Sequence, residues 1–482
     1  MKINPFIFRN YDIRGIVPQD LDAEKVEAIG KAYGTFLRRR KIRQAVVGRD
    51  CRLSGEEFQK AFIGGLTSMG VDVINIGMVM TQMVYFAQYR FQVNGSAMIT
   101  ASHNPANFNG FKLGVGYSKT TLENDVLEIK NYVDNDNYFK SDRTGTVEKK
   151  EITEDYYHDV LKRINLKKKF RVVIDSRHGT TGMYIPEIFR RAGCEVIGKH
   201  LEVDGNFPVG TPDPTDEHFM NSLGEVVREE KADLGFCFDG DGDRMGLVDG
   251  EGRLLWNDVM VAIFAQEILE RFKGSKIVYN TLCSQIVRET VKKNGGTPVI
   301  ERTGHSFIKD KIAKVGAAFG GELSGHFFFA DNAYGHDDGS YAALRILEYL
   351  SDKNMPLAEL YETLPQFISS PEIKIGCPDD KKQAVIKELS KKFKSDFSNA
   401  EINDANTIPG DDGVRADFND GMMVFRYSQN GPYITIKFEA KDQETYEARR
   451  KYVRDILKMY PDMIWEDQLC VNLEHLNQSM SF

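Results

Sequence analysis

The sequence has little of what marks a zinc protein, a disulfide scaffold or a membrane protein. Six cysteines are scattered over 482 residues, with no C-x-x-C pair and no cysteine–histidine cluster, so neither a zinc site nor a disulfide framework is expected. No run of about 18 apolar residues occurs. No apolar core of about 7–15 residues follows the first charge, so a signal peptide is not expected either.

An excess of basic residues is also missing. Lysine and arginine together number 63 against 71 aspartates and glutamates, which gives a net charge of −8. A mildly acidic chain lacks the global charge that attracts nucleic acid or an anionic membrane, and we expect neither as a partner. The composition, 41% hydrophobic and 28% charged, is ordinary for a globular chain. We expect a soluble protein of a reducing compartment, the cytoplasm.

One phrase recurs three times along the chain. An apolar strand, a loop and a helix are followed by G-x-x-V-I, which begins at Gly70, Gly193 and Gly296. The opening strands lie near Val46, Val172 and Ile277. The glycine fits the residue beyond a helix end, and the V-I fits the next strand. Three such units spaced by roughly a hundred residues predict three related α/β domains.

The last part of the chain has a different pattern. Strands are predicted at 371–376, 414–418, 422–427 and 433–438, with a charged amphipathic helix at 379–393. Strand runs with helices beside them predict an α+β domain. The predicted domains are 1–145, 146–253, 254–368 and 369–482.

The first candidate motif is T-A-S-H-N-P at residues 100–105, directly after the strand candidate 97–99. Ser102 therefore sits just past a strand end, where α/β domains usually place their sites. An ordinary turn is the alternative interpretation, since His, Asn and Pro are common in turns. Lys112, ten residues on, is either a proton partner of the serine or a solvated side chain.

The second motif is D-G-D-G-D-R after the strand 234–238. Asp239, Asp241 and Asp243 alternate with glycines, whose flexibility lets three carboxylates converge on a hard cation such as Mg²⁺. An EF-hand is excluded, because Arg244 and Gly250 stand where its glycine and glutamate are required. Three unpaired carboxylates would repel one another, so the pattern favours a metal site.

Two further motifs are less specific. In G-G-E-L-S-G-H, the side chains of Glu322, Ser324 and His326 would point one way if the segment is extended, as a comb for sugar hydroxyls. A turn between strands is the alternative. Residues 426–432 (R-Y-S-Q-N-G-P) resemble a phosphate cradle or an ordinary hairpin turn. A lone histidine such as His305 is more often structural.

Taken together, these motifs resemble the α-D-phosphohexomutase superfamily, most of all its phosphomannomutase/phosphoglucomutase branch. The resemblance runs from Y-D-I-R-G at residues 11–15 to F-E-A at 438–440, and the serine and three-aspartate phrases are highly specific as a pair. It implies three related mixed-sheet α/β domains plus a C-terminal α+β domain around a central cleft. In that order the domains would carry the phosphoserine, the Mg²⁺-binding loop, the sugar-binding loop and the phosphate-binding loop.

The resemblance also implies roles for individual residues. Ser102 is implied as the phosphoserine, whose phosphate joins Asp239, Asp241 and Asp243 around Mg²⁺. Lys112 and His305 are implied as general acid/base residues, and Arg14 and Arg244 as arginines near the phosphoserine. The implied substrate-binding residues are Tyr11, Glu322, Ser324, His326, Arg426, Ser428, Gln429 and Asn430.

The implied reaction is reversible phosphate transfer between the 1- and 6-positions of mannose or glucose phosphate. It would pass through phosphoserine and a hexose 1,6-bisphosphate, which is also the activator. Asn430 stands where the family often has Thr, and Gln82 follows Thr81 where Pro is common. The alternatives are a phosphoglucosamine mutase and a non-catalytic sugar-phosphate-binding paralogue. The expected assembly is a monomer or a homodimer.

Overall fold

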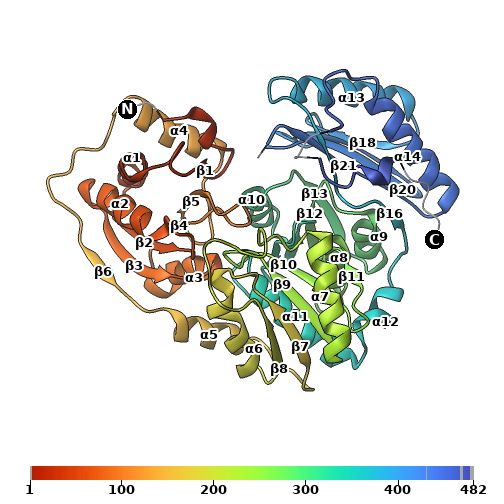
Figure 1. Cartoon of the computed structure of the whole chain (residues 1–482), viewed down its shortest axis with the longest axis horizontal. Helices are drawn as coiled ribbons and strands as arrows, with labels where there is room; N and C mark the ends of the chain where they lie inside the picture. Colours follow the sequence, from red (N-terminus) through yellow and green to blue (C-terminus); the bar gives the residue numbers. More distant parts are fainter. Residues whose placement is uncertain (1–2, 430, 467–469, 478–482) are drawn as a thin grey trace. The chain divides into compact units, whose positions relative to one another are not determined.

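The computed structural model describes residues 3–429, 431–466 and 470–477. It divides into two compact units. Figure 1 draws the chain with its helices and strands labelled. The first unit comprises residues 1–257 and 324–360, and the second comprises residues 258–323 and 361–482.

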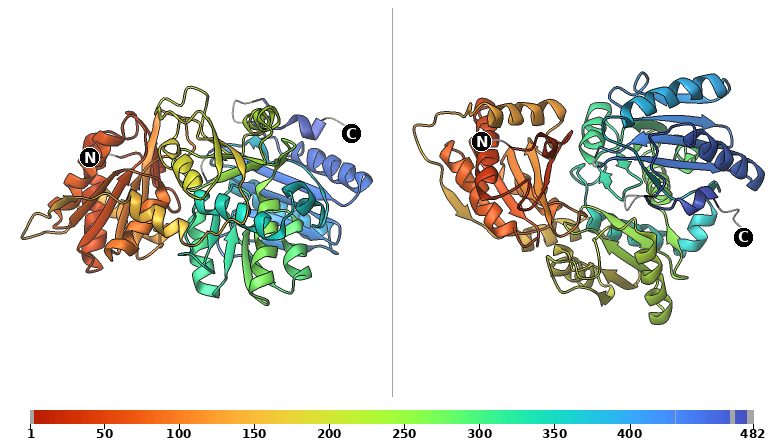
Figure 2. Two further views of the ribbon diagram at one scale, coloured as in Figure 1. Left: turned by 90° about the horizontal axis from the view of Figure 1, so that it is seen from below. Right: turned by 45° about the horizontal axis from the view of Figure 1, so that its top comes forward.

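The first unit begins with a mixed six-stranded sheet in the order β1-β5-β4-β2-β3-β6. The strands are β1 (Ile13–Ile16), β2 (Gln44–Arg49), β3 (Asp72–Met78), β4 (Gly95–Ile99), β5 (Phe108–Val115) and β6 (Val147–Lys149). The helices are η1 (Pro5–Ile7), α1 (Ala23–Arg39), α2 (Gly55–Ser68), α3 (Thr81–Phe91) and α4 (Glu123–Asp134). Figure 2 shows these strands, in red and orange, side by side with helices beside them.

Helix α1 shows how the sequence specifies its elements. Its stripe of Val26, Ile29, Tyr33 and Phe36 is fully buried against the sheet, as the 3.6-residue period predicts. The Asp22 carboxylate accepts the backbone N–H of Lys25 at 3.0 Å and caps the helix start. The predicted N-cap is confirmed.

The second sheet of this unit has the order β11-β10-β9-β7-β8. Its strands are β7 (Arg171–Asp175), β8 (Glu195–Lys199), β9 (Leu234–Phe238), β10 (Met245–Val248) and β11 (Leu254–Leu255). The associated helices are α5 (Thr153–Leu161), η2 (Thr180–Met183), α6 (Ile185–Arg191), α7 (Glu217–Glu230) and α11 (Gly339–Lys353). All five residues of β9 are buried, so the segment that follows it starts inside the protein. The returning segment 324–360 also contains β15 (Phe327–Phe329), and α12 (Leu357–Glu362) follows.

The second unit contains a parallel sheet in which β12 pairs with β13 and β14. These strands are β12 (Lys276–Asn280), β13 (Thr297–Glu301) and β14 (Phe319–Gly321). Their helices are α8 (Asn257–Arg271), α9 (Gln285–Lys293) and α10 (His305–Val315).

The C-terminal sheet of this unit is antiparallel, in the order β16-β21-β20-β19-β18, with β17 also pairing β21. The strands are β16 (Ile368–Ser369), β17 (Ile373–Gly376), β18 (Glu401–Asp404), β19 (Gly413–Phe418), β20 (Gly421–Tyr427) and β21 (Tyr433–Ala440). The helices are α13 (Lys382–Asp396), α14 (Gln443–Leu457) and α15 (Glu474–Asn477). The four predicted strands and the predicted helix of this region are confirmed, although the helix begins three residues later than predicted.

The recurring phrase marks the same structural unit each time. In each repeat the opening strand pairs in parallel with the V-I strand, as β2 with β3, β7 with β8 and β12 with β13. Gly70 and Gly193 have positive φ beyond their helices, as predicted. In the third repeat that position belongs to Gly295 (φ 75°) rather than Gly296, because α9 ends one residue earlier relative to the phrase. The predicted fold class is confirmed, whereas the domain boundaries and the central cleft stay predictions.

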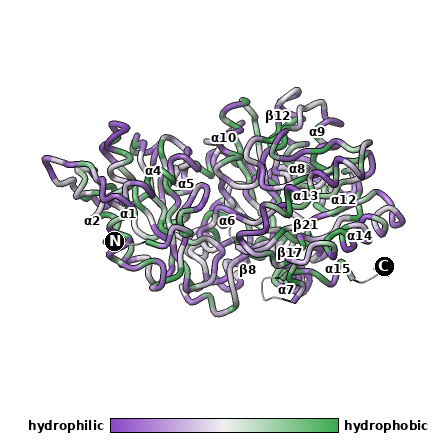
Figure 3. Tube along the Cα trace, turned by 90° about the horizontal axis from the view of Figure 1, so that it is seen from above, coloured by the Kyte–Doolittle hydropathy of each residue, from purple (hydrophilic) through white to green (hydrophobic). Residues whose placement is uncertain are grey.

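Figure 3 shows hydrophilic and hydrophobic residues interleaved in short segments along the trace. In keeping with this, no helix among the described residues has both the length and the apolar character needed to cross a bilayer.

Candidate active site

The serine loop leaves the carboxyl end of β4, which pairs in parallel with β2. Ser102 is fully buried and has a φ of 53°. That left-handed conformation costs a non-glycine residue about 1–2 kcal/mol. The loop is therefore held in place by its surroundings rather than by its own backbone preference.

Ser102 contacts the first residue of the carboxylate loop. Its Oγ donates to Asp239 Oδ2 at 2.6 Å and lies 3.2 Å from His103 Nδ1. The two predicted motifs, 137 residues apart in sequence, therefore meet at one point. Sequence reasoning assigned no role to His103.

The carboxylate loop gathers its three aspartates as the sequence predicts. Asp239, Asp241 and Asp243 are fully buried, and one carboxylate oxygen of each lies within 4.8 Å of the others. Gly242 makes the turn with a φ of 82°, and a Cβ on it would lie 2.8 Å from Thr181. Only glycine fits this turn without strain.

Two carboxylate oxygens in this cluster make no hydrogen bonds. Asp241 Oδ1 and Asp243 Oδ1 are buried without a partner among the described residues. Buried carboxylate oxygens without donors are costly unless a cation balances them. Oxygen donors of this kind suit Mg²⁺, so the residues present fit a divalent cation.

Lys112 on β5 supplies a positive charge to the cluster. Its buried Nζ donates to Asp241 Oδ2 at 2.7 Å and also to Asp243. Burial lowers the pKa of Lys112, but Asp241 and Asp243 outweigh burial and raise that pKa above its usual range. The amine is therefore protonated and cannot act as a base while these contacts persist. The solvated alternative for Lys112 is wrong.

The side chains of His326 and Asp337 hold Arg244 in place near Asp239, the carboxylate that Ser102 contacts. The Nε of Arg244 donates to His326 Nε2 at 2.9 Å, so the imidazole proton is on Nδ1. That nitrogen lies 3.0 Å from Asp337 Oδ2. Sequence reasoning missed Asp337, whose only signal is its place in a D-D-G sequence before helix α11.

Arg14 on β1 approaches the serine loop from the other side. Its Nε donates to Asp12 at 2.7 Å and its Nη1 to Asn104 Oδ1 at 2.8 Å. Within the described part of the chain, neither the Nη2 of Arg14 nor the two terminal nitrogens of Arg244 donate a hydrogen bond. These nitrogens are available to a phosphate. Tyr11 precedes β1, and its carbonyl accepts the hydroxyl of Thr121 at 3.1 Å.

The predicted hydroxyl comb does not form in the way the sequence suggested. Residues 322–325 are a turn rather than a strand, and Gly325 has a φ of 93°, so alternate side chains do not share one face. His326 turns toward Arg244 in the first unit. Glu322 belongs to the second unit, where its carboxylate accepts the Gly304 N–H at 2.8 Å. His305, next to Gly304, is the buried first residue of α10.

The predicted phosphate loop in the second unit already holds an anionic side chain. Arg426 donates through Nε and Nη2 to the two oxygens of Asp412 at 2.9 and 2.5 Å. Gln429 donates to the same carboxylate at 2.7 Å. Sequence reasoning missed Asp412. Ser428 is buried in this loop, and Asn430 lies outside the described residues.

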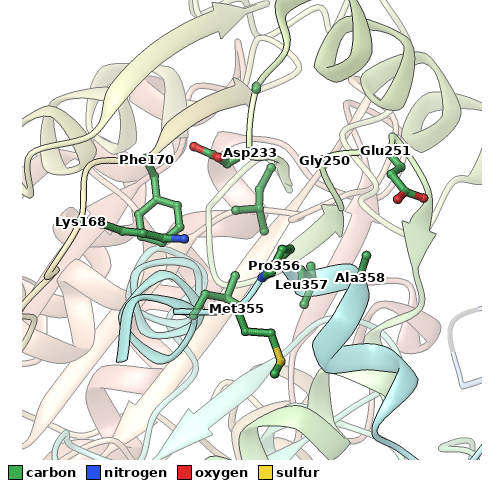
Figure 4. Close-up of a pocket in the computed structure, with 12 residues that line it drawn as sticks. Lys168, Phe170, Asp233, Gly250, Glu251, Met355, Pro356, Leu357 and Ala358 are labelled. Atoms are coloured by element: carbon green, nitrogen blue, oxygen red, sulfur yellow. The ribbon is translucent and has the colours of Figure 1, made fainter. Parts of the chain in front are cut away.

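A separate cavity of about 220 Å³ in the first unit takes no part in this site. Figure 4 shows its lining, which includes Lys168, Phe170, Asp233, Met355 and Leu357. None of the predicted site residues lines it.

Comparison with known proteins agrees with these motifs. Profiles of the phosphoglucomutase/phosphomannomutase alpha/beta/alpha domains I, II and III match residues 5–139, 154–252 and 256–367. The chain is 36% identical over 460 residues to a phosphoglucomutase from Neisseria gonorrhoeae, covering 95% of this chain and 98% of the relative. It is 36% identical over 452 residues to a phosphomannomutase/phosphoglucomutase from Pseudomonas aeruginosa, covering 94% and 95%.

A solved structure gives the same result. A phosphoglucomutase/phosphomannomutase family protein from Burkholderia thailandensis superposes with a TM-score of 0.86 and 32% identity, covering 95% of this chain and 98% of that one. The chain therefore belongs to the phosphoglucomutase/phosphomannomutase family of the α-D-phosphohexomutase superfamily. The predicted family is confirmed.

The first testable prediction concerns cation binding. Replacing Asp241 with Asn removes a charge from the cluster while keeping the shape, so titration calorimetry with Mg²⁺ should show affinity reduced by about 10-fold or more. Asp72→Asn, which breaks an exposed ion pair with Arg143, should leave Mg²⁺ affinity unchanged. Equal affinity in wild type and Asp241→Asn would contradict the assignment.

The second prediction concerns Asp411, beside the phosphate loop. Burial, and then the charge of Asp412, raise the pKa of Asp411 to about 8 from the ordinary 3.8, although Arg426 acts in the opposite direction. The folded state therefore keeps a proton that the unfolded state releases, so this group's contribution to stability falls as pH rises from about 4 to about 8. Asp411→Asn should melt at a higher temperature than wild type at pH 9 and at about the same temperature at pH 4.

The control residue is Asp404, whose pKa is shifted in the opposite direction. Burial raises the pKa of Asp404, but Lys394 and Ser390 outweigh burial and hold that pKa at about 2. Asp404→Asn should therefore melt at a lower temperature than wild type at neutral pH. Identical pH profiles of melting temperature in wild type and Asp411→Asn would show that Asp411 is not held protonated.

Proposed function

We propose that this chain moves a phosphoryl group between the 1- and 6-positions of a hexose phosphate, through phosphoserine at Ser102 and a hexose 1,6-bisphosphate. The contact between the Ser102 hydroxyl and Asp239 carries the proposal. It brings a nucleophile to a cluster of carboxylates with two oxygens available for a cation. The enzyme is an intramolecular phosphotransferase.

The residues around Ser102 suit phosphoryl transfer, which depends mainly on positioning and on neutralising oxygens. The sugar hydroxyl attacks phosphorus and passes its proton to the general acid/base residue. The bond from phosphorus to Ser102 Oγ breaks, and Oγ takes up a proton through its contact with Asp239 Oδ2. The terminal nitrogens of Arg244 and Arg14 can donate to the phosphoryl oxygens. Mg²⁺ bound by Asp239, Asp241 and Asp243 would supply further positive charge to those oxygens.

The return step uses the same groups in reverse. Ser102 Oγ attacks the second phosphate of the bisphosphate and gives its proton to Asp239 Oδ2, which already accepts it in a hydrogen bond. The bond from phosphorus to the sugar oxygen breaks, and that oxygen takes a proton from the general acid/base residue. The 1- and 6-phosphates must therefore exchange places between the two steps. Lys112 is charged in the structure and can act as the acid, and His305 is the second candidate for proton transfer.

Substrate recognition is proposed for the second unit and the 322–326 turn. Asp412 accepts from Nε and Nη2 of Arg426. Among the described residues Nη1 donates no hydrogen bond, and it is proposed to bind a phosphate oxygen. Ser428, Gln429 and Asn430 are proposed to complete the site for the non-reacting phosphate. Glu322 and Ser324, with Tyr11 and His326, are proposed to contact the sugar.

A non-catalytic sugar-phosphate binder would have no need for a buried serine hydrogen-bonded to this carboxylate cluster. A phosphoglucosamine mutase would use the same groups, so the assay must include that sugar. Four further points stay predictions: the cytoplasmic location, the assembly as a monomer or homodimer, the absence of nucleic acid as a partner, and the bisphosphate activator.

The third prediction tests the nucleophile. Ser102→Ala should lower kcat by at least about 10³-fold, because no other hydroxyl occupies that position. Circular dichroism and melting temperature should show that the variant still folds. Turnover comparable to wild type in this variant would contradict the mechanism.

The fourth prediction concerns the sugar. Glucose and mannose differ only at C2, so a site that recognises O3, O4 and a distant phosphate discriminates weakly between them. We expect kcat/KM for the two sugar phosphates to lie within about 100-fold, and Glu322→Gln to lower both together. Activity on glucosamine phosphate alone, or loss of one sugar only in Glu322→Gln, would contradict this recognition.

A further inference from the structure

Arg52, just after β2, is a fully buried arginine whose donors are all used. Its side chain has no exposed area. Nε donates to Asp50 Oδ2 at 3.2 Å, Nη1 to the carbonyls of Pro105 and Phe108 at 2.6 and 2.9 Å, and Nη2 to those of Ser102 and Asn104 at 2.8 and 2.6 Å. A guanidinium has five N–H donors, and each has an acceptor here.

Four of these acceptors belong to residues 102–108. Three are in the serine loop, and the fourth, Phe108, is the first residue of β5. Backbone carbonyls turned inward from a loop need donors as much as those in a strand do. The Arg52 guanidinium donates to all four of these carbonyls. The Phe207 ring, with its centroid 5.1 Å from the Arg52 Cζ, lies against the guanidinium.

Asp50 links the same arginine to the backbone of the nucleophile. Its Oδ2, which accepts Arg52 Nε, also accepts the Thr100 hydroxyl at 2.7 Å. The Thr100 hydroxyl oxygen in turn accepts the N–H of Ser102 at 2.8 Å. The N–H and the carbonyl of Ser102 are therefore both fixed by the Asp50–Arg52 pair, the first through Thr100 and the second directly.

The use of its donors distinguishes Arg52 from the arginines that can bind phosphate. Arg14 and Arg244 keep terminal nitrogens for a ligand, whereas Arg52 keeps none. Arg52 can therefore act on the reaction only through the loop. The loop needs such support, because Ser102 has a left-handed φ of 53°, a conformation that a serine does not favour by itself.

We propose that Arg52, supported by Asp50, is a positioning residue that holds Ser102 in its left-handed conformation with Oγ directed at Asp239. The inference rests on the proposed function, since it assigns Arg52 to the same phosphoryl transfer. Without the guanidinium, the carbonyl of Pro105 keeps only the Phe108 N–H as a donor among the described residues. The carbonyls of Ser102 and Asn104 lose the Arg52 donor, and Ser102 relaxes away from Asp239. The in-line geometry then weakens, while the proposed sugar and distant-phosphate contacts remain.

The test compares Arg52→Met and Arg52→Lys in the full-length chain, with Arg345→Met as the matched control. Arg345 is also a buried arginine of the first unit, paired with Asp331 and remote in sequence from the serine loop. Steady-state kinetics with glucose 1-phosphate and catalytic glucose 1,6-bisphosphate give kcat and KM, and thermal melting reports folding.

For Arg52→Met we expect kcat to fall by about 10²-fold with KM within about 3-fold of wild type. Arg52→Lys should retain more activity, because its three donors can serve part of the loop. Arg345→Met should lower the melting temperature and leave kcat per folded molecule unchanged. A folded Arg52→Met with kcat within about 3-fold of wild type, or an equal loss of kcat in Arg345→Met, would overturn the inference.

If Arg52→Met does not fold, Thr100→Val provides the decisive measurement. It keeps the shape but removes the hydroxyl between Asp50 and the Ser102 N–H, so kcat should fall by about 10-fold with KM unchanged. An unchanged kcat would count against positioning through this link. Wild-type turnover in the same assay tests the proposed function separately, because an inactive wild type refutes that function whatever the variants do.

Discussion

The carboxylates of Asp239, Asp241 and Asp243 impose the main constraint on the first unit. Three carboxylates this close and this buried repel one another and lose their hydration. The fold keeps them together by bringing Lys112 from β5 and Arg244 from the end of the same loop. Two of their oxygens accept no hydrogen bond from the residues that the structure describes. A divalent cation can supply the missing positive charge there, and the arginine donors can supply it around a phosphate.

Much of the surrounding structure serves to place groups at that cluster. Parallel pairing of β2 with β4 brings Asp50 and Thr100 to the same strand end, and the serine loop starts there. The carboxylate loop leaves β9 inside the protein. His326 and Asp337, which return late in the chain, complete the support of Arg244. The groups of the site thus come from several separate segments, and buried polar contacts between these segments hold them in place.

The sequence predicted the parts of this site that are encoded locally. Ser102 and the three aspartates stand in short, specific phrases after apolar strands, and the repeats followed from the G-x-x-V-I phrase. Asp337 and Asp412 were missed because neither stands in one of the recognised motifs. Arg52 was missed because the serine loop that it contacts begins 50 residues away in sequence, and a buried arginine looks like an exposed one in the sequence. The comb of Glu322, Ser324 and His326 failed because Gly325 turns the chain, a turn that the S-G pair already signalled.

The central claim is that phosphate passes through Ser102, and a pulse–chase experiment tests it most directly. The enzyme is loaded with ³²P from labelled glucose 1,6-bisphosphate, the labelled peptide is identified by mass spectrometry, and unlabelled glucose 6-phosphate is then added. The account predicts label on Ser102 alone, leaving as sugar phosphate at least as fast as kcat. Label on another residue, or label on Ser102 that leaves more slowly than the enzyme turns over, would contradict it.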